Sequence, residues 1–257
     1  MKQNSQTNFL QAKLPWLDVI VFITWGILLL KYWFTGQLKL LIHPNYFILV
    51  LCSGLILFAI GGFKAKQLIT SRKLARKPGD NLQHITLFPP GWSTGLLLVV
   101  AIVALIIPPG ILGSQTALRR GVTDSLPATK VEAQSFRATV KPEERTIIDW
   151  VRTINAYPEP DYYVDQKVDV VGFVVRDSQL GDDYLLISRF VLTCCAVDAY
   201  PVSLTVNLTA SNNKYPADTW LRVKGKIVAG EVGGKRQIIV EPSSLTKVST
   251  PKDPYAY

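Results

Sequence analysis

Three long apolar runs occupy the first 110 residues, and short apolar runs separated by polar turns follow them. The long runs cover residues 14–34, 46–63 and 93–108, and the third is just long enough to cross a bilayer when residues 90–92 are included. A helix rises about 1.5 Å per residue, so some 20 residues span a hydrocarbon core of roughly 30 Å. The sequence therefore predicts a membrane region over residues 1–110, with spans at about 14–34, 46–63 and 90–108. A partly inserted or re-entrant helix is the alternative for the short third run.

The first run contains one acid, Asp18, in its first turn. At that depth a carboxylate reaches the headgroup region, so we expect an interfacial or capping acid; a functional acid within the membrane is the alternative. The acid, the length of the run and the lack of a small-residue cleavage site before Lys31 argue against a cleaved signal peptide.

The pattern changes after residue 110. Residues 111–141 are polar and irregular and are predicted to be a linker. Pro142 is expected to begin a helix, because proline suits the first helical position and Glu143 and Glu144 suit its positive end. Apolar residues then fall on one helical face: Ile147, Ile148, Val151 and Ile154.

Five strand patterns follow the helix, at residues 166–177, 184–192, 201–208, 220–228 and 237–240. The last two are expected to pair across a turn that contains Gly233 and Gly234. Short strands at about ten-residue spacing are typical of a small barrel or sandwich, and Gly172 and Gly225 inside the strands fit an OB-like barrel. The predicted fold is thus membrane α plus mostly β: transmembrane helices, then an OB-like β-barrel or sandwich domain with one helix over residues 142–250.

The net charge of +9 is unevenly distributed. Residues 1–120 hold twelve Lys and Arg against two acids, whereas residues 121–257 hold sixteen against seventeen. A nucleic-acid-binding domain needs its own basic surplus. The alternation of Trp220, Lys224 and Lys226 is therefore expected to be an exposed strand face, and no nucleic-acid partner is expected.

The basic residues predict the orientation in the membrane. Six of them lie between the second and third spans, with Asp80 as the one acid there: Lys64, Lys66, Arg72, Lys73, Arg76 and Lys77. The positive-inside rule places this loop in the cytoplasm. Three spans then place the C-terminal domain on the extracytoplasmic side of the cell (inner) membrane; Arg119 and Arg120 oppose this weakly.

One segment of the domain carries candidate chemistry. Cys194, Cys195 and Asp198 lie within five residues, between two strand patterns. Thiolates suit soft or borderline ions such as Zn²⁺ or Cu⁺. Both thiols face one ion only if the chain turns there, and Asp198 then comes to the same side. The domain has no histidine, since His43 and His84 precede it. The site is therefore expected to be open, or completed by a partner or by an acid elsewhere.

Two other interpretations of this segment remain. Adjacent cysteines form a strained, readily reduced disulfide, which favours a thiol-redox switch, although no CxxC motif is present. Alternatively, the cysteines pack as small apolar residues while Asp198 caps a turn.

The same segment carries a resemblance to a family. The run RF…CCAVDAYP, with VVGFVVRD before it and WLRVKGKI after it, resembles the YcgQ-type family of uncharacterised bacterial membrane proteins. The most specific part is CC-x-x-D-A-x-P, carried here by Cys194, Cys195, Asp198, Ala199 and Pro201. Genes of this family often neighbour a predicted permease, and some such clusters are linked to zinc homeostasis. The resemblance implies an accessory subunit of a permease that handles a metal.

We therefore expect a membrane-anchored accessory or binding subunit that works with a multi-span permease, with Zn²⁺ as the expected metal and no catalytic residues. An extracytoplasmic thiol-redox protein using Cys194 and Cys195 is the alternative. The sequence lacks a phosphate-binding loop, and the domain has no histidine for a Ser-His-Asp arrangement, so hydrolase and NTPase functions are poorly supported.

Overall fold

The computed structural model describes residues 3–71, 91–121, 141–208 and 215–257. The chain divides into two compact units, Met1–Gly110 and Ile111–Tyr257, which we describe separately. Several residues on which the sequence predictions draw lie outside the described ranges: Arg72, Lys73, Arg76, Lys77, Asp80, His84 and residues 122–140.

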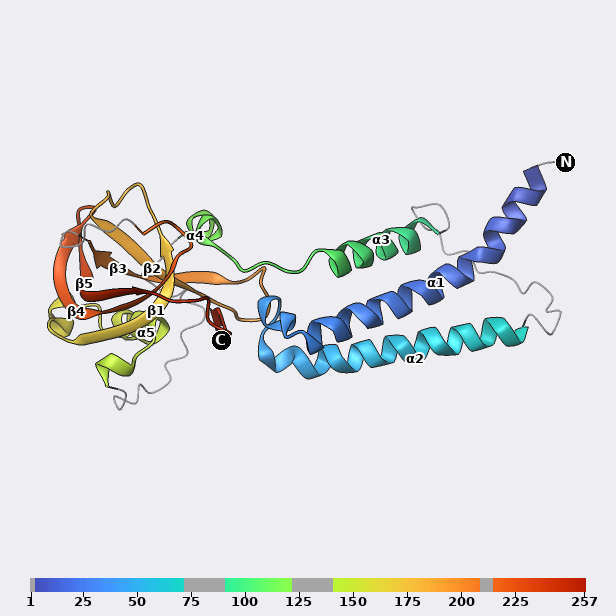
Figure 1. Cartoon of the computed structure of the whole chain (residues 1–257), viewed down its shortest axis with the longest axis horizontal. Helices are drawn as coiled ribbons and strands as arrows, with labels where there is room; N and C mark the ends of the chain where they lie inside the picture. The colour runs from blue at the N-terminus through green and yellow to red at the C-terminus, as the bar shows by residue number, and fades with distance from the viewer. Residues whose placement is uncertain (1–2, 72–90, 122–140, 209–214) are drawn as a thin grey trace. The chain divides into compact units, whose positions relative to one another are not determined.

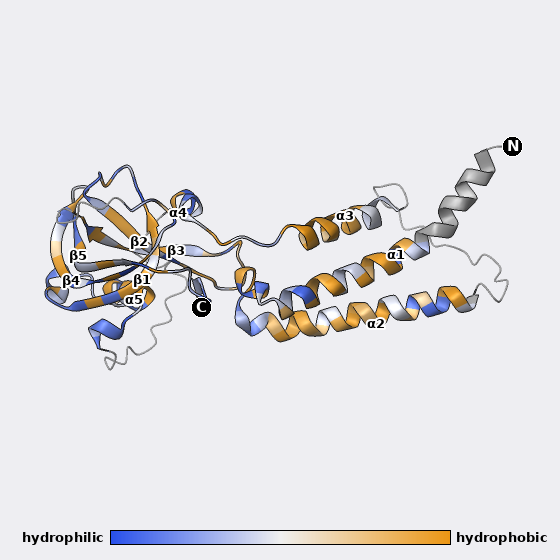
Figure 2. Cartoon of the chain, in the orientation of Figure 1, coloured by the Kyte–Doolittle hydropathy of each residue, from blue (hydrophilic) through white to orange (hydrophobic). Residues whose placement is uncertain are grey.

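The first unit contains three main helices, α1 (Gln3–Phe34), α2 (Phe47–Ser71) and α3 (Trp92–Ile106), with short 3-10 turns η1 (Gln37–Leu40) and η2 (Pro44–Tyr46) between α1 and α2. By length and composition, Pro15–Phe34 and Pro44–Thr70 are long and apolar enough to cross a membrane. Helix α3 has 15 residues, a length of about 22 Å, and apolar residues lie all around it (Figure 2). Helix α2 extends past residue 63, so Lys64 and Lys66 lie on a helix rather than in a loop.

A polar cluster joins the three helices at one end of this unit. The Asp18 carboxylate of α1 lies 3.3 Å from the Lys64 ammonium of α2, and the Thr94 hydroxyl of α3 donates to the same carboxylate at 3.3 Å. At the other end of α1, Lys31 donates to the carbonyl oxygen of Leu105 on α3. These contacts require α1, α2 and α3 to alternate in direction. Asp18 is thus an ion-paired acid that holds helices together.

The second unit is built around five strands: β1 (Lys167–Val175), β2 (Tyr184–Val191), β3 (Tyr200–Asn207), β4 (Trp220–Val232) and β5 (Lys235–Lys247) (Figure 1). The strands pair in the order β1-β4-β5-β3-β2, and β2 pairs again with β1, which closes a barrel. The β3–β5 pairing is parallel, and the other four pairings in the barrel are antiparallel. This arrangement is consistent with an OB-like fold. The expected turn is present, with Gly233 and Gly234 both at positive φ between β4 and β5.

Helix α5 (Ile147–Ala156) packs against the barrel and buries the predicted apolar face. Ile147, Ile148 and Val151 lie in the core with residues of all five strands, and Ile154 packs against it. The helix begins later than expected. Thr146 and Asp149 form a capping box that satisfies the first backbone N–H groups, whereas residues Pro142–Glu144 form a separate 3-10 turn, η4. A further 3-10 turn, η5 (Pro160–Tyr163), leads from α5 towards β1.

Two segments expected to lie outside the domain pack against the barrel. Helix α4 (Ser114–Arg120) falls in the predicted linker, and the Asp218 carboxylate, before β4, accepts hydrogen bonds from the Ser114 N–H and hydroxyl at its first turn. Strand β6 (Tyr255–Ala256) lies beyond the expected boundary at residue 250 and pairs in parallel with β2. Tyr255 is buried, and its hydroxyl accepts a hydrogen bond from the Leu112 N–H. Both segments are too short to show a helical or strand periodicity in the sequence. Contacts with distant residues hold them in place.

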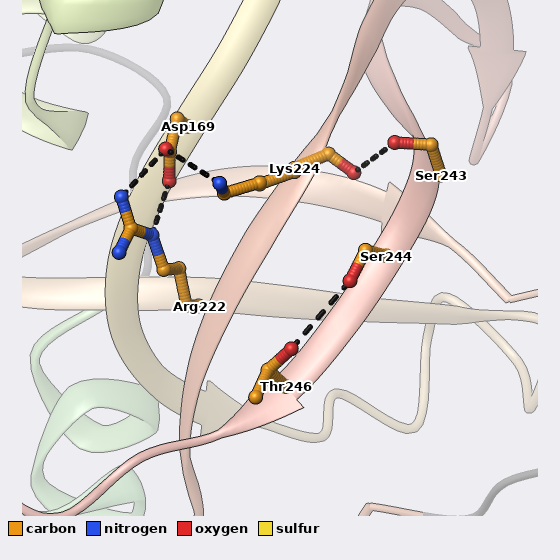
Figure 3. Close-up of polar contacts among 6 residues, drawn as sticks. All are labelled: Asp169, Arg222, Lys224, Ser243, Ser244 and Thr246. Carbon is orange, nitrogen blue, oxygen red and sulfur yellow. Dashed lines mark hydrogen bonds and ion pairs between the residues drawn. The ribbon is translucent and has the colours of Figure 1, made fainter.

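Strand β5 is also longer than the predicted residues 237–240. Its second half, up to Lys247, pairs with the first half of β4 after an irregularity at Lys224 and Gly225. The segment is polar because it faces outwards, and Figure 3 shows Ser243, Ser244 and Thr246 along it. The period-two pattern of a half-buried strand is therefore weak there.

The basic residues of β4 are paired with acids. Asp169 of β1 accepts two hydrogen bonds of 2.7 Å from Arg222 and lies 3.6 Å from the Lys224 ammonium (Figure 3). The hydrogen bond from Arg222 is the main reason that the pKa of Asp169 is lowered. Lys226 pairs with Asp165. Trp220 is 8% exposed and packs edge-on against Phe173. The expected exposed strand face is present at Lys224 and Lys226, with its charges largely balanced, whereas Trp220 is buried rather than exposed.

Gly172 is the position in β1 where the barrel leaves no space for a side chain. A Cβ atom there would lie 2.5 Å from the Ser188 carbonyl oxygen of β2 and 2.8 Å from the Ile147 side chain of α5. We predict that Gly172→Ala lowers the free energy of unfolding by about 1–3 kcal/mol, because the backbone of β2 must shift. The measurement is urea-dependent hydrogen exchange of β1 and β2 peptides in the full-length chain. Lys167→Ala, at an exposed position of β1, is the control, and equal exchange in both variants would contradict the prediction.

Candidate functional site

The candidate residues lie in the loop that joins β2 to β3. Val191 and Tyr200 are the last paired residues of the two strands, and residues 192–199 connect them. The structure therefore places a turn where the sequence analysis required one. It brings Cys194, Cys195 and Asp198 together, with one ligand atom of each within 4.8 Å of the others.

The Asp198 carboxylate closes this loop. Its two oxygen atoms accept hydrogen bonds from the backbone N–H groups of Cys194 and Cys195, each at 3.0 Å. The Asp198 N–H in turn donates to the Cys195 carbonyl oxygen at 3.1 Å. Because the carboxylate accepts hydrogen bonds from both cysteine N–H groups, it fixes the backbone that carries both thiols. The role of turn cap, one of the alternatives for Asp198, is thus present in the structure.

The two thiols lie side by side and face solvent. Their sulfur atoms are 3.8 Å apart, far beyond the roughly 2.05 Å of a disulfide bond. Cys194 is exposed, Cys195 is partly exposed, and Val197 in the same loop is 85% exposed. The third cysteine, Cys52, lies on α2 in the first unit and takes no part in this loop.

The loop holds the Cys194 thiol in its protonated form. The pKa of Cys194 is raised to about 11, first by the hydrogen bond to the Asp198 carboxylate and then by the hydrogen bond to Cys195. A thiol that stays protonated at neutral pH is a poor nucleophile, because the thiolate is the reactive species. The arrangement therefore does not activate Cys194 for redox exchange. A cation that binds both sulfurs must displace their protons.

Arg120 supports the loop from α4, and the sequence analysis did not find it. Its guanidinium donates to the carbonyl oxygen of Ala196 at 3.1 Å and also to that of Ala199. The only signal in the sequence is the basic pair at residues 119–120, which bears on topology alone. Contacts across 76 and 79 residues leave no local pattern, so only the structure reveals this positive charge beside the loop.

Strand β6 supports the other side of the loop. The Leu192 N–H, just before the cysteines, donates to the Ala256 carbonyl oxygen at 2.9 Å. Arg189 of β2 donates to the backbone oxygens of Asp253 and Pro254, next to β6. The loop is therefore held by α4, β6 and its own carboxylate, which favours one arrangement of the two thiols.

These features define a protein with an apolar helical unit followed by an OB-like barrel that presents two thiols and a carboxylate on one loop. The profile of the DUF1980 C-terminal domain matches residues 127–257, so the chain belongs to this uncharacterised family. The matched range contains all the barrel strands and the cysteine loop, whereas α4 and Arg120 precede it. Neither the curated proteins nor the solved structures include a match to this chain.

Asp198→Asn removes the charge that raises the pKa of Cys194. We expect this pKa to fall towards the ordinary thiol value of 9.0, so that more thiolate is present at pH 9. The alkylation rate of Cys194 by iodoacetamide should rise severalfold, because the gain in thiolate outweighs the lower nucleophilicity of a less basic thiolate. The measurement compares the chain that keeps Asp198 with the Asp198→Asn variant, both in a Cys52→Ser, Cys195→Ser background with chelator present. Unchanged or slower alkylation of the variant would show that Asp198 does not control the thiol.

Proposed function

We propose that this chain is a membrane-anchored metal-binding module that serves a multi-span permease. In this proposal the loop between β2 and β3 binds Zn²⁺ or a softer ion through the thiolates of Cys194 and Cys195. Asp198 holds the loop and offers a carboxylate oxygen close to the ion. The domain handles the metal on the extracytoplasmic side, and the permease provides the transport path.

The observation that carries this proposal is the separation of the two sulfur atoms. Zinc–thiolate bonds of about 2.3 Å at a tetrahedral angle place two sulfur ligands about 3.8 Å apart. The sulfur atoms of Cys194 and Cys195 lie 3.8 Å apart, with a carboxylate oxygen within 4.8 Å. Soft thiolates favour Zn²⁺ or Cu⁺ over Mg²⁺ or Ca²⁺.

The first unit supports the proposed membrane anchor. Apolar residues predominate along α2 and α3 (Figure 2). Ile48, Leu55 and Val99 are exposed there, and a bilayer or the helices of a permease would cover such side chains. The cluster of Asp18, Lys64 and Thr94 requires three helices of alternating direction. If all three cross, the C-terminal unit lies opposite the basic segment that follows Lys64, and the positive-inside rule puts that segment in the cytoplasm.

The YcgQ-type resemblance supports the proposed partner. It rests on the segment CC-x-x-D-A-x-P, and it implies a permease encoded nearby and a link to zinc homeostasis. Ion transport paths through a membrane are built from charged and polar groups, and the apolar helices of this chain carry few of them. A permease partner would supply that path.

Cys194→Ser and Cys195→Ser should each weaken Zn²⁺ binding by at least about tenfold, because each removes one of the proposed thiolate ligands. Competition of the reduced full-length chain with a chromogenic chelator in detergent measures the affinity. Affinity for the wild-type chain should rise with pH by about tenfold per unit for each proton displaced, since the pKa of Cys194 lies far above neutrality. Cys52→Ser is the matched control and should bind as the wild-type chain does. Absence of stoichiometric binding, or equal binding by all three variants, would refute the site.

We also expect the C-terminus to lie outside the cytoplasm. A reporter that is active only outside the cytoplasm should be active when fused after Tyr257, and the same reporter placed after residue 77 should be inactive. The reverse pattern would mean that the orientation is wrong. Activity at neither position would mean that α3 does not cross the membrane.

A further inference from the structure

We propose that two copies of this chain share one metal ion, each supplying Cys194 and Cys195, so that four thiolates complete the site. This inference rests on the proposed metal-binding function and names the partner that closes its coordination shell.

The loop of one copy does not offer four ligands. Within residues 3–71, 91–121, 141–208 and 215–257, the only group of three or more metal-binding side chains is Cys194, Cys195 and Asp198. Both Asp198 oxygens already accept hydrogen bonds from the amides of the two cysteines. The carboxylate is thus better placed to position the thiols than to replace one as a ligand. A tetrahedral ion held by two thiolates has two positions left to fill.

A second copy has the right ligands in an accessible place. The two thiols are accessible to solvent. Val197, an apolar residue of the same loop, is 85% exposed. Two loops that meet around a twofold axis would bring four sulfurs to one ion and pack the two Val197 side chains near it. Such a contact uses the same surface on both copies and closes on itself. Copies in one membrane also present this loop on the same side.

Titration of the reduced full-length chain with Co²⁺ tests the ligand count. We expect the thiolate-to-cobalt absorption to saturate at one ion per two chains, with four protons released per ion. Saturation at one ion per chain with two protons released would overturn the shared site and leave the proposed metal function intact. Absence of any thiolate-to-cobalt absorption would defeat the metal function itself.

Co-capture tests the contact between copies. Two differently tagged full-length chains, mixed in detergent, should capture each other when Co²⁺ is added and separate when a chelator follows. Val197→Asp leaves every thiol in place but sets two carboxylates against each other, and should weaken capture at least tenfold. Cys52→Ser should capture normally, and Cys194→Ser with Cys195→Ser should not capture. Capture that is independent of both metal and cysteines would overturn the proposal.

Discussion

The fold of the C-terminal unit depends on β1 pairing with two strands at once. Phe173 is opposite Trp220 of β4 on one side and opposite Ser188 of β2 on the other, which turns an open sheet into a closed barrel. The close approach leaves no room for a side chain at Gly172. Closure also brings apolar residues of all five strands into the core that α5 covers. The buried set that includes Trp150, Val174 and Leu204 exists as one core only because the two sheet edges meet.

Closure of the barrel fixes the hairpin on which the cysteines lie. The β2–β3 ladder runs without interruption from Tyr184 and Asn207 to Val191 and Tyr200, so the loop leaves a rigid base. Hydrogen bonds from its flanks then restrict it further. A pair of adjacent cysteines would face opposite sides in a regular strand. Here the Asp198 carboxylate keeps the backbone out of strand geometry, and the two sulfur atoms remain close without bonding to each other.

The sequence predicted the parts of this fold that local pattern controls. Alternating or valine-rich runs located all five barrel strands, although only the first half of β5, and helical spacing located the buried face of α5. The same reasoning failed where pairing partners decide the structure. The polar second half of β5 and the two-residue β6 are strands because β4 and β2 offer free edges to them. For the site, the spacing of Cys194, Cys195 and Asp198 was sufficient to bring the three together. Arg120 was not predictable, because its contact with Ala196 spans 76 residues and matches no motif.

Strand β6 has a consequence for how the protein is made. A chain grows from its N-terminus, so residues 255–256 are synthesised after all the strands that form the barrel. Until they emerge, the Leu192 N–H lacks the carbonyl of Ala256 and Arg189 lacks the backbone oxygens that it binds beside β6. A shortened translation product that ends before Tyr255 would then form a barrel, but Leu192, just before the cysteines, would lack its hydrogen bond to β6. Synthesis of residues 255–256 thus becomes a condition for holding the two thiols in one arrangement.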